Sequence, residues 1–121
     1  MSSTTTAWPS SLQVDATKRV LTISFDDGHE FAIDAELLRV NSPSAEVQGH
    51  SPDQRVIVGG KRNVTIRDMV PTGNYAVRIV FSDGHDTGIF TWGYLYDVGR
   101  DGPALWHAYL TELQAKGLTR G

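Results

Sequence analysis

A hexapeptide that occurs twice places the strongest constraint on the fold of this chain. Phe25-Asp-Asp-Gly-His-Glu and Phe81-Ser-Asp-Gly-His-Asp match 56 residues apart in a sequence of 121 residues. Asp-Gly favours two-residue hairpin turns, because both residues tolerate a positive φ. Residues 19–25 and 74–81, which lead into the two copies, have the alternating or β-branched pattern of strands. The repeat therefore predicts two β-hairpins, arising either from an internal duplication or from convergence on favourable turn chemistry.

The other elements are predicted from hydrophobic periodicity and from the positions of glycine and proline. Strands are expected over residues 29–33, 55–58, 64–67 and 87–90, with a turn at 59–62 and a loop over 41–54. Short helices are expected over residues 35–39, capped by Asp34, and over residues 92–98.

A C-terminal helix is the clearest of the predicted elements. Pro103 suits the first helical turn, Asp101 the cap position and Gly117 the end. Its apolar residues recur at helical spacing: Leu105, Trp106, Tyr109, Leu110 and Leu113. We predict an α+β fold in which small antiparallel sheets, built from β-hairpins, carry short helices and this amphipathic helix. Residues 1–11 are expected to form a flexible arm, and residues 12–121 one domain.

Composition excludes several classes of protein. The chain has no cysteine, which rules out disulfides, thiolate nucleophiles and thiolate metal sites. A net charge of −3 argues against nucleic-acid binding, and no apolar run is long enough to span a membrane. The N-terminal segment lacks the basic flank and apolar core of a secretory signal, so a cytoplasmic location is expected.

Four histidines are the main candidates for chemistry. His29 and His85 directly follow the two hairpin turns, where we expect them on partly exposed loops. There each is either solvated or bonded to a turn carbonyl, or else it serves as a metal ligand or proton shuttle. His107 is expected on the outer face of the terminal helix. None of the histidines has the His-x-Asp spacing of a non-haem iron site, and no nucleophile elbow or phosphate loop is present. We therefore expect no enzymatic activity.

Two longer stretches, Leu37–Gly49 and Gly73–Tyr96, resemble the gamma-butyrobetaine hydroxylase-like N-terminal domain family. The resemblance extends over about residues 12–115. Bacterial stand-alone members of this family are small proteins of unknown function. The same domain precedes the catalytic domain of gamma-butyrobetaine and trimethyllysine dioxygenases, and it ends some P-loop iron–sulfur carrier ATPases. The resemblance thus implies a non-catalytic accessory or adaptor domain.

The resemblance also implies a metal site that this chain has vacated. In the dioxygenases, three cysteines and a histidine hold a structural zinc. The cysteine positions fall here on Ser42, Ser44 and Val47, and the histidine falls on His85. We therefore expect no cofactor, and we expect Ser42 and Ser44 to pack beside the turn at residues 83–85. The alternative is a small zinc- or iron-binding protein that uses His85 with nearby Asp83, Asp86 or His50.

An interaction surface is expected around the same segments. Its candidate residues are Arg39, Ser42, Ser44, Asp83, His85 and Trp92. The expected partner is another protein, related to iron–sulfur or oxygenase machinery, and a homodimer remains an open alternative.

Overall fold

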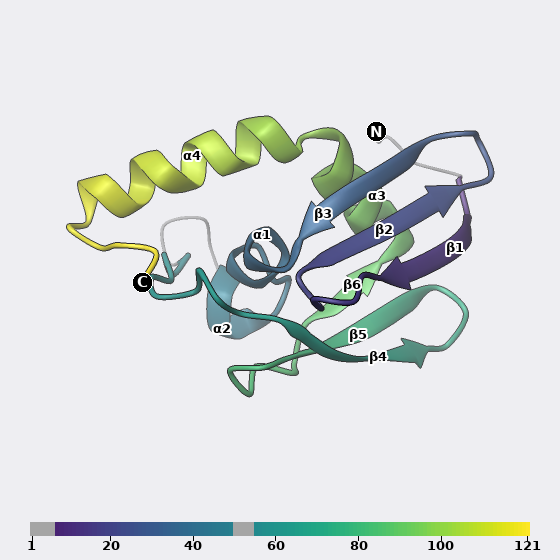
Figure 1. Cartoon of the computed structure of the whole chain (residues 1–121), viewed down its shortest axis with the longest axis horizontal. Helices are drawn as coiled ribbons and strands as arrows, with labels where there is room; N and C mark the ends of the chain where they lie inside the picture. Colours follow the sequence, from purple (N-terminus) through teal and green to yellow (C-terminus); the bar gives the residue numbers. More distant parts are fainter. Residues whose placement is uncertain (1–6, 50–54) are drawn as a thin grey trace.

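The computed structural model describes residues 7–49 and 55–121, which form two three-stranded antiparallel sheets and several helices (Figure 1). This arrangement confirms the predicted α+β class. The elements, in chain order, are β1 (Pro9–Val14), β2 (Val20–Phe25), β3 (Glu30–Asp34), α1 (Ala35–Val40), α2 (Ala45–Gln48), β4 (Ile66–Thr72), β5 (Ala76–Phe81), β6 (Ile89–Thr91), α3 (Trp92–Arg100) and α4 (Gly102–Ala115).

The first sheet has the strand order β1-β2-β3. Alternation along β2 places Leu21, Ile23 and Phe25 on its buried face, each at most 3 % exposed. β3 returns antiparallel, with Leu21 opposite Ile33, as the hairpin prediction requires.

Strand β1 was not predicted, and its residues 9–11 lie within the segment expected to be a flexible arm. It pairs antiparallel with β2, and Leu12 lies opposite Ile23. β1 is an edge strand, and only Leu12 and Val14 of its side chains pack against the core. Two apolar residues give too short an alternation to indicate a strand from sequence.

The second sheet, β4-β5-β6, repeats the plan of the first. β5 begins and ends 56 residues after β2, and each middle strand leads into a turn whose glycine has a positive φ: 92° at Gly28 and 90° at Gly84. The first strand of each sheet carries a register shift, and a helix follows each third strand. The hexapeptide echo thus extends to the order and pairing of whole elements.

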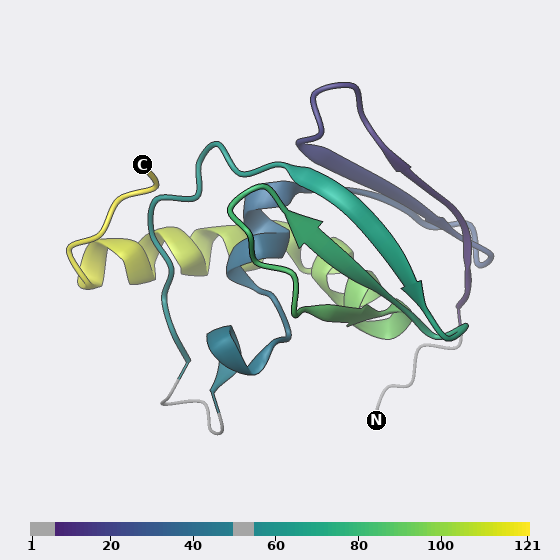
Figure 2. The same cartoon turned by 90° about the horizontal axis from the view of Figure 1, so that it is seen from below.

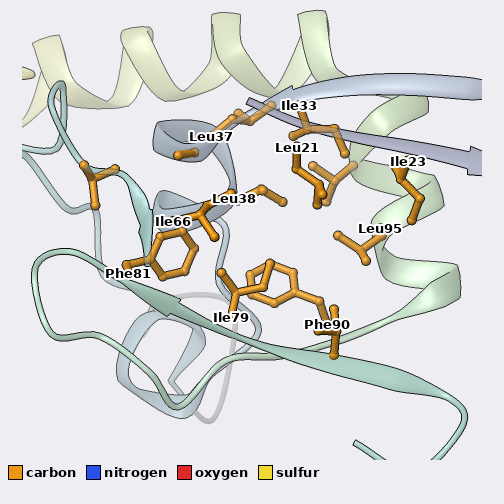
Figure 3. Packing of buried hydrophobic residues seen from close by; sticks show 14 of the residues in the cluster. Leu21, Ile23, Ile33, Leu37, Leu38, Ile66, Ile79, Phe81, Phe90 and Leu95 are labelled. Carbon is orange, nitrogen blue, oxygen red and sulfur yellow. The ribbon is translucent and has the colours of Figure 1, made fainter. Parts of the chain in front are cut away.

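The core lies between the two sheets, with α1 and α3 filling the space beside it (Figure 3). The first sheet contributes Leu21, Ile23 and Ile33, and the second sheet contributes Ile66, Ile79, Phe81 and Phe90. A smaller cluster attaches α4 through Tyr109 and Leu113 to Val40 of α1. Within the described ranges, no helix has the length and apolarity that crossing a membrane requires.

The helix ends agree with the sequence in position but not in every contact. Asp34 and Asp101 occupy the N-cap positions of α1 and α4, yet neither side chain makes a capping hydrogen bond. The Asp101 carboxylate instead pairs with Arg100 at 3.0 Å. Gly117, with φ 67°, follows the last turn of α4, and the next amide donates back to the carbonyl of Leu113 at 2.9 Å.

The prediction for residues 55–62 was wrong. These residues form neither a strand nor a hairpin turn. Residues 60–62 pair instead with the C-terminal tail, which lies beside this segment in Figure 2. Gly60 and Arg62 donate to the carbonyls of Thr119 and Arg120 at 2.9 and 2.8 Å. The β-branched run predicted an extended chain correctly, but a partner nearly 60 residues away leaves no local signal.

Two smaller expectations were also wrong, one about the loop over residues 41–54 and one about the C-terminal helix. The predicted loop over residues 41–54 contains the short helix α2. Leu110, assigned to the apolar stripe of α4, is 38 % exposed, because the stripe that packs is the narrower one through Tyr109 and Leu113. His107 is exposed, as expected.

Candidate functional site

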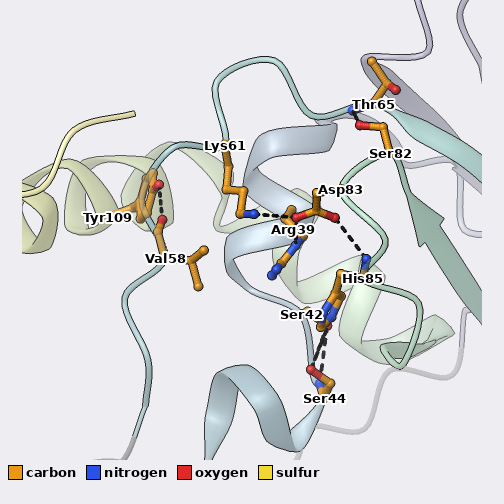
Figure 4. Close-up of polar contacts among 10 residues, drawn as sticks. All are labelled: Arg39, Ser42, Ser44, Val58, Lys61, Thr65, Ser82, Asp83, His85 and Tyr109. Atoms are coloured by element: carbon orange, nitrogen blue, oxygen red, sulfur yellow. Dashed lines mark hydrogen bonds and ion pairs between the residues drawn. The ribbon is translucent and has the colours of Figure 1, made fainter. Parts of the chain in front are cut away.

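Two segments that lie some 40 residues apart in sequence meet at His85 (Figure 4). Ser42 and Ser44 lie between α1 and α2, and His85 ends the turn after β5. The Nε2 atom of His85 is 2.9 Å from the Ser42 hydroxyl and 3.3 Å from the Ser44 hydroxyl. This contact confirms the predicted packing of the serine segment against the turn.

The expectation that His85 lies on a partly exposed loop was wrong, since the residue is only 7 % exposed. Its backbone amide donates to the Asp83 carboxylate at 3.1 Å, and its carbonyl accepts from the amide of Phe81 at 2.9 Å. With the turn fixed in this way, the α1–α2 connection covers the imidazole. The resemblance placed the serine segment beside this turn, but the sequence did not indicate that the segment buries the histidine side chain.

Gly88 lets the return segment approach the serines closely. A Cβ atom at this position would lie 2.3 Å from the Ser42 hydroxyl oxygen and 3.1 Å from the ring of Phe90. Any side chain here would therefore collide with the cluster. The absence of a side chain at Gly88 is a structural requirement of the contact between Ser42 and His85.

Asp83 is the electrostatic centre of the cluster. Its carboxylate accepts from Arg39 Nε at 2.8 Å and from Lys61 Nζ at 2.6 Å. Partial burial alone would raise the pKa of Asp83, but the hydrogen bonds from Lys61 and Arg39 outweigh it and lower the pKa to about 2. Asp83 is thus a permanently charged anchor between two cations, and not a proton donor or acceptor near neutral pH.

Arg39 is only 9 % exposed, yet its hydrogen-bonding groups are not all paired. Its Nη1 atom is the one buried side-chain polar atom in the described part of the chain that has no hydrogen-bond partner. The guanidinium therefore holds Asp83 through Nε, and its Nη1 group is left without a partner.

The remaining predicted site residues are dispersed. Val47 is buried at 1 % exposure and packs as an apolar residue. Asp86 pairs with Arg78 at 3.6 Å on the surface, and Trp92 donates its indole N–H to the carbonyl of Asn74. His50 lies outside the described residues. Of the expected interaction surface, all the residues except Trp92 come together.

No metal centre is assembled among the residues that the structure describes, since no three His, Asp or Glu side chains converge there. The chemistry of the donor set agrees with this geometry. Structural zinc takes thiolate, imidazole or carboxylate ligands, whereas the vacated positions supply two hydroxyls and a valine. The residues at the four positions do not fit a zinc ion.

Sequence reasoning missed an apolar groove of about 290 Å³ on another face. It lies where β3 meets α1 and the junction of α3 with α4, elements that adjoin in Figure 1. Its lining residues include Ala32, Ile33, Leu37, Val98, Pro103 and Trp106. The one sequence signal for this groove was the apolar stripe predicted for the terminal helix, because Trp106 of that stripe lines it.

Fold and site together define a small α+β domain in which the buried side chains of Ser42, Ser44 and His85 bind one another. The model of the family described as gamma-butyrobetaine hydroxylase-like, N-terminal, matches residues 12–96, and the chain belongs to this family. The match ends before α4, earlier than the resemblance over residues 12–115 suggested. A comparison with curated proteins gave no match.

Solved structures extend the similarity to nearly the whole chain. Two proteins with NMR solution structures are 45 % and 43 % identical to it, with TM-scores of 0.84 and 0.81; the alignments cover 99 % and 94 % of this chain and 89 % and 90 % of theirs. A crystal structure from Acidithiobacillus ferrooxidans is 40 % identical, with a TM-score of 0.63, over 75 % of this chain and 91 % of that one. The latter is described as a protein of unknown function of the DUF971 family.

Proposed function

We propose that this chain is a non-catalytic domain that binds another protein and needs no metal to do so. The resemblance to an accessory domain supports this role and points to a partner related to iron–sulfur or oxygenase machinery. The residues that the resemblance covers all belong to the accessory domain, so none of them corresponds to the catalytic domain of the dioxygenases. The proposal concerns recognition, not turnover.

One contrast within the molecule carries the proposal. The side chains that could take part in catalysis or metal binding are engaged with each other, since His85 bonds to Ser42 and the Asp83 carboxylate is held by two cations. The apolar groove between β3 and α4 is open to solvent. Ligand-binding surfaces of this kind are concave and mostly apolar, with a few polar groups at the rim.

The metal part of the proposal is tested by elemental analysis of purified protein. We expect the wild type to contain no stoichiometric zinc or iron, and its thermal midpoint to be unchanged by EDTA. The matched positive control restores the thiolates, as Ser42→Cys, Ser44→Cys and Val47→Cys together, and should bind one zinc ion per chain. One equivalent of metal in the wild type, lost in His85→Ala, would instead establish the alternative of a small metal-binding protein.

The binding part is tested with two leucine substitutions at helix-start glycines. Gly102→Leu projects into the groove, where its Cβ would meet only Leu37 at 3.9 Å. Gly93→Leu adds the same side chain where nothing lies within 4 Å. A partner recovered in stoichiometric amount from the native cells should be retained by Gly93→Leu and lost by Gly102→Leu. Failure of the wild type to retain any protein would overturn the proposal.

A further inference from the structure

The outer edge of β3 carries backbone groups that its own sheet does not use. In the hairpin, the amide of Phe25 donates to the carbonyl of His29, and the amide of Ala35 donates to the carbonyl of Arg19. Hydrogen-bonded and non-bonded pairs alternate along an antiparallel ladder, so Ala32, opposite Thr22, is a non-bonded position. The N–H and C=O of Ala32 therefore point away from β2, toward the free edge.

This free edge forms one wall of the apolar groove. Ala32 and Ile33 line it on the strand side, and Val98 and Trp106 line it on the helix side. In the described part of the chain, no backbone group outside the sheet is hydrogen-bonded to Ala32. An exposed edge with unpaired N–H and C=O groups is a template for an added strand, and an adjoining apolar pocket gives that strand side-chain specificity.

The charges on β3 decide which strand fits. Glu30, Ala32 and Asp34 share the outer, exposed face, so two carboxylates flank the open position. If a second copy paired antiparallel about Ala32, Glu30 of each copy would lie opposite Asp34 of the other. Like charges directly opposite each other are destabilising. Lysine or arginine at the same positions would be favourable. The edge thus disfavours self-association and selects a basic partner strand.

We propose that an extended segment of a partner protein adds to β3 as a fourth strand, with basic residues opposite Glu30 and Asp34 and with apolar residues at alternate positions that enter the groove. Residues directly opposite each other lie on the same face of a sheet, so the basic and apolar side chains must alternate. This inference rests on the proposed function and specifies the partner's chemistry at the groove.

The probe is an acetylated and amidated heptapeptide that alternates lysine and valine. Binding is followed by titration with NMR detection of the amides of β3. We expect the Ala32 amide to shift and to become protected from exchange. Two control peptides should bind at least tenfold more weakly: one with glutamate for lysine, which reverses the charges, and one N-methylated at its lysines, which removes the amides that face Ala32.

Proline substitution supplies the matched pair of protein variants. Ala32→Pro removes only an outward N–H and should abolish peptide binding while the ladder with β2 is kept. Ile89→Pro does the same on β6, where Ile89, opposite Arg78, is likewise a non-bonded position, and should bind as the wild type does. Glu30→Lys with Asp34→Lys should reverse the preference between lysine and glutamate peptides. If Ala32→Pro fails to fold, as judged by circular dichroism, the N-methylated peptide decides.

Equal binding of the lysine and glutamate peptides, or of the methylated and unmethylated ones, would overturn the inference. So would loss of binding in Ile89→Pro but not in Ala32→Pro. The proposed function fails separately: a natural partner retained by Ala32→Pro would leave a binding domain that uses another surface, whereas the absence of any partner for the wild type would remove the binding role itself.

Discussion

The two Asp-Gly-His turns have nearly the same backbone and very different surroundings. In each, the histidine amide donates to the aspartate carboxylate, at 2.9 Å for His29 and 3.1 Å for His85. In each, the phenylalanine amide donates to the histidine carbonyl, at 2.8 and 2.9 Å. Yet the His29 side chain is 61 % exposed, while His85 is buried. Local sequence fixed the turn, and it did not fix the role of the histidine.

The difference comes from the element that each turn meets. The first turn contacts α3, the helix after the other hairpin, through Tyr96, whose hydroxyl lies 2.8 Å from Asp27 and 3.0 Å from His29. The second turn contacts the segment that follows α1, through Ser42. Each hairpin thus meets the helix region that belongs to the other, and only the second contact closes over its histidine. Four predictions test this contrast.

Gly88→Ala should cause the largest loss, about 3 kcal/mol of the free energy of unfolding, because its methyl group would overlap the Ser42 hydroxyl. The residue 56 positions earlier in the first hairpin is Ala32, whose side chain is exposed. The reverse change, Ala32→Gly, should cost only about 0.5–1 kcal/mol. Chemical denaturation measures both, and similar losses would contradict the tight contact at Gly88.

His85→Ala should destabilise the protein by about 2 kcal/mol, since it removes the partner of two buried hydroxyls. His29→Ala, at a solvated side chain, should change the unfolding midpoint little. Thermal unfolding of the two variants at one pH provides the comparison. Equal effects would mean that the buried turn is no more important to the fold than the exposed one.

Asp83 should give the protein a pH-dependent stability that Asp27 gives more weakly. The folded pKa of Asp83, about 2, lies below the ordinary aspartate value of 3.8, so its contribution is complete above about pH 4 and is lost as the pH falls toward 2. We expect Asp83→Asn to cost about 1 kcal/mol at pH 7 and to flatten the stability profile between pH 4 and pH 2. In Asp27→Asn that profile should stay close to the wild type.

Tyr96→Phe should have the smallest effect. It removes the hydroxyl that contacts Asp27 and His29 at an exposed site, and the aromatic contact with Phe25 is kept. We expect no measurable change in the unfolding midpoint and a shift only in the NMR signals of the His29 ring. A marked destabilisation would show that the first turn depends on α3 as strongly as the second depends on the serines.

Most of the fold could be predicted because its signals are local. The Asp-Gly turns, the alternation along β2 and the proline and glycine at the ends of α4 each act within a few residues. The short edge strand β1 could not be predicted from two apolar residues. The pairing of residues 60–62 with the C-terminal tail, which involves Thr119 and Arg120, left no local mark.

The candidate site was also predictable only in part. The resemblance to related domains brought Ser42, Ser44 and His85 together before their distances were known. Lys61 was predicted in a hairpin turn and instead holds Asp83, because the misassigned segment passes over the second turn. The groove beside Ala32 joins four elements, and no window of sequence contains it.

The α+β class, two hairpins with a common turn, and a donor set that does not suit zinc are all encoded locally in the amino-acid sequence. These properties follow from backbone preferences and from the chemistry of individual side chains. Which histidine is buried, which cations hold Asp83, and which strand edge is left open are settled by tertiary packing. Those outcomes depend on packing between segments far apart in the chain, and burial and charge pairing are properties of neighbours in space.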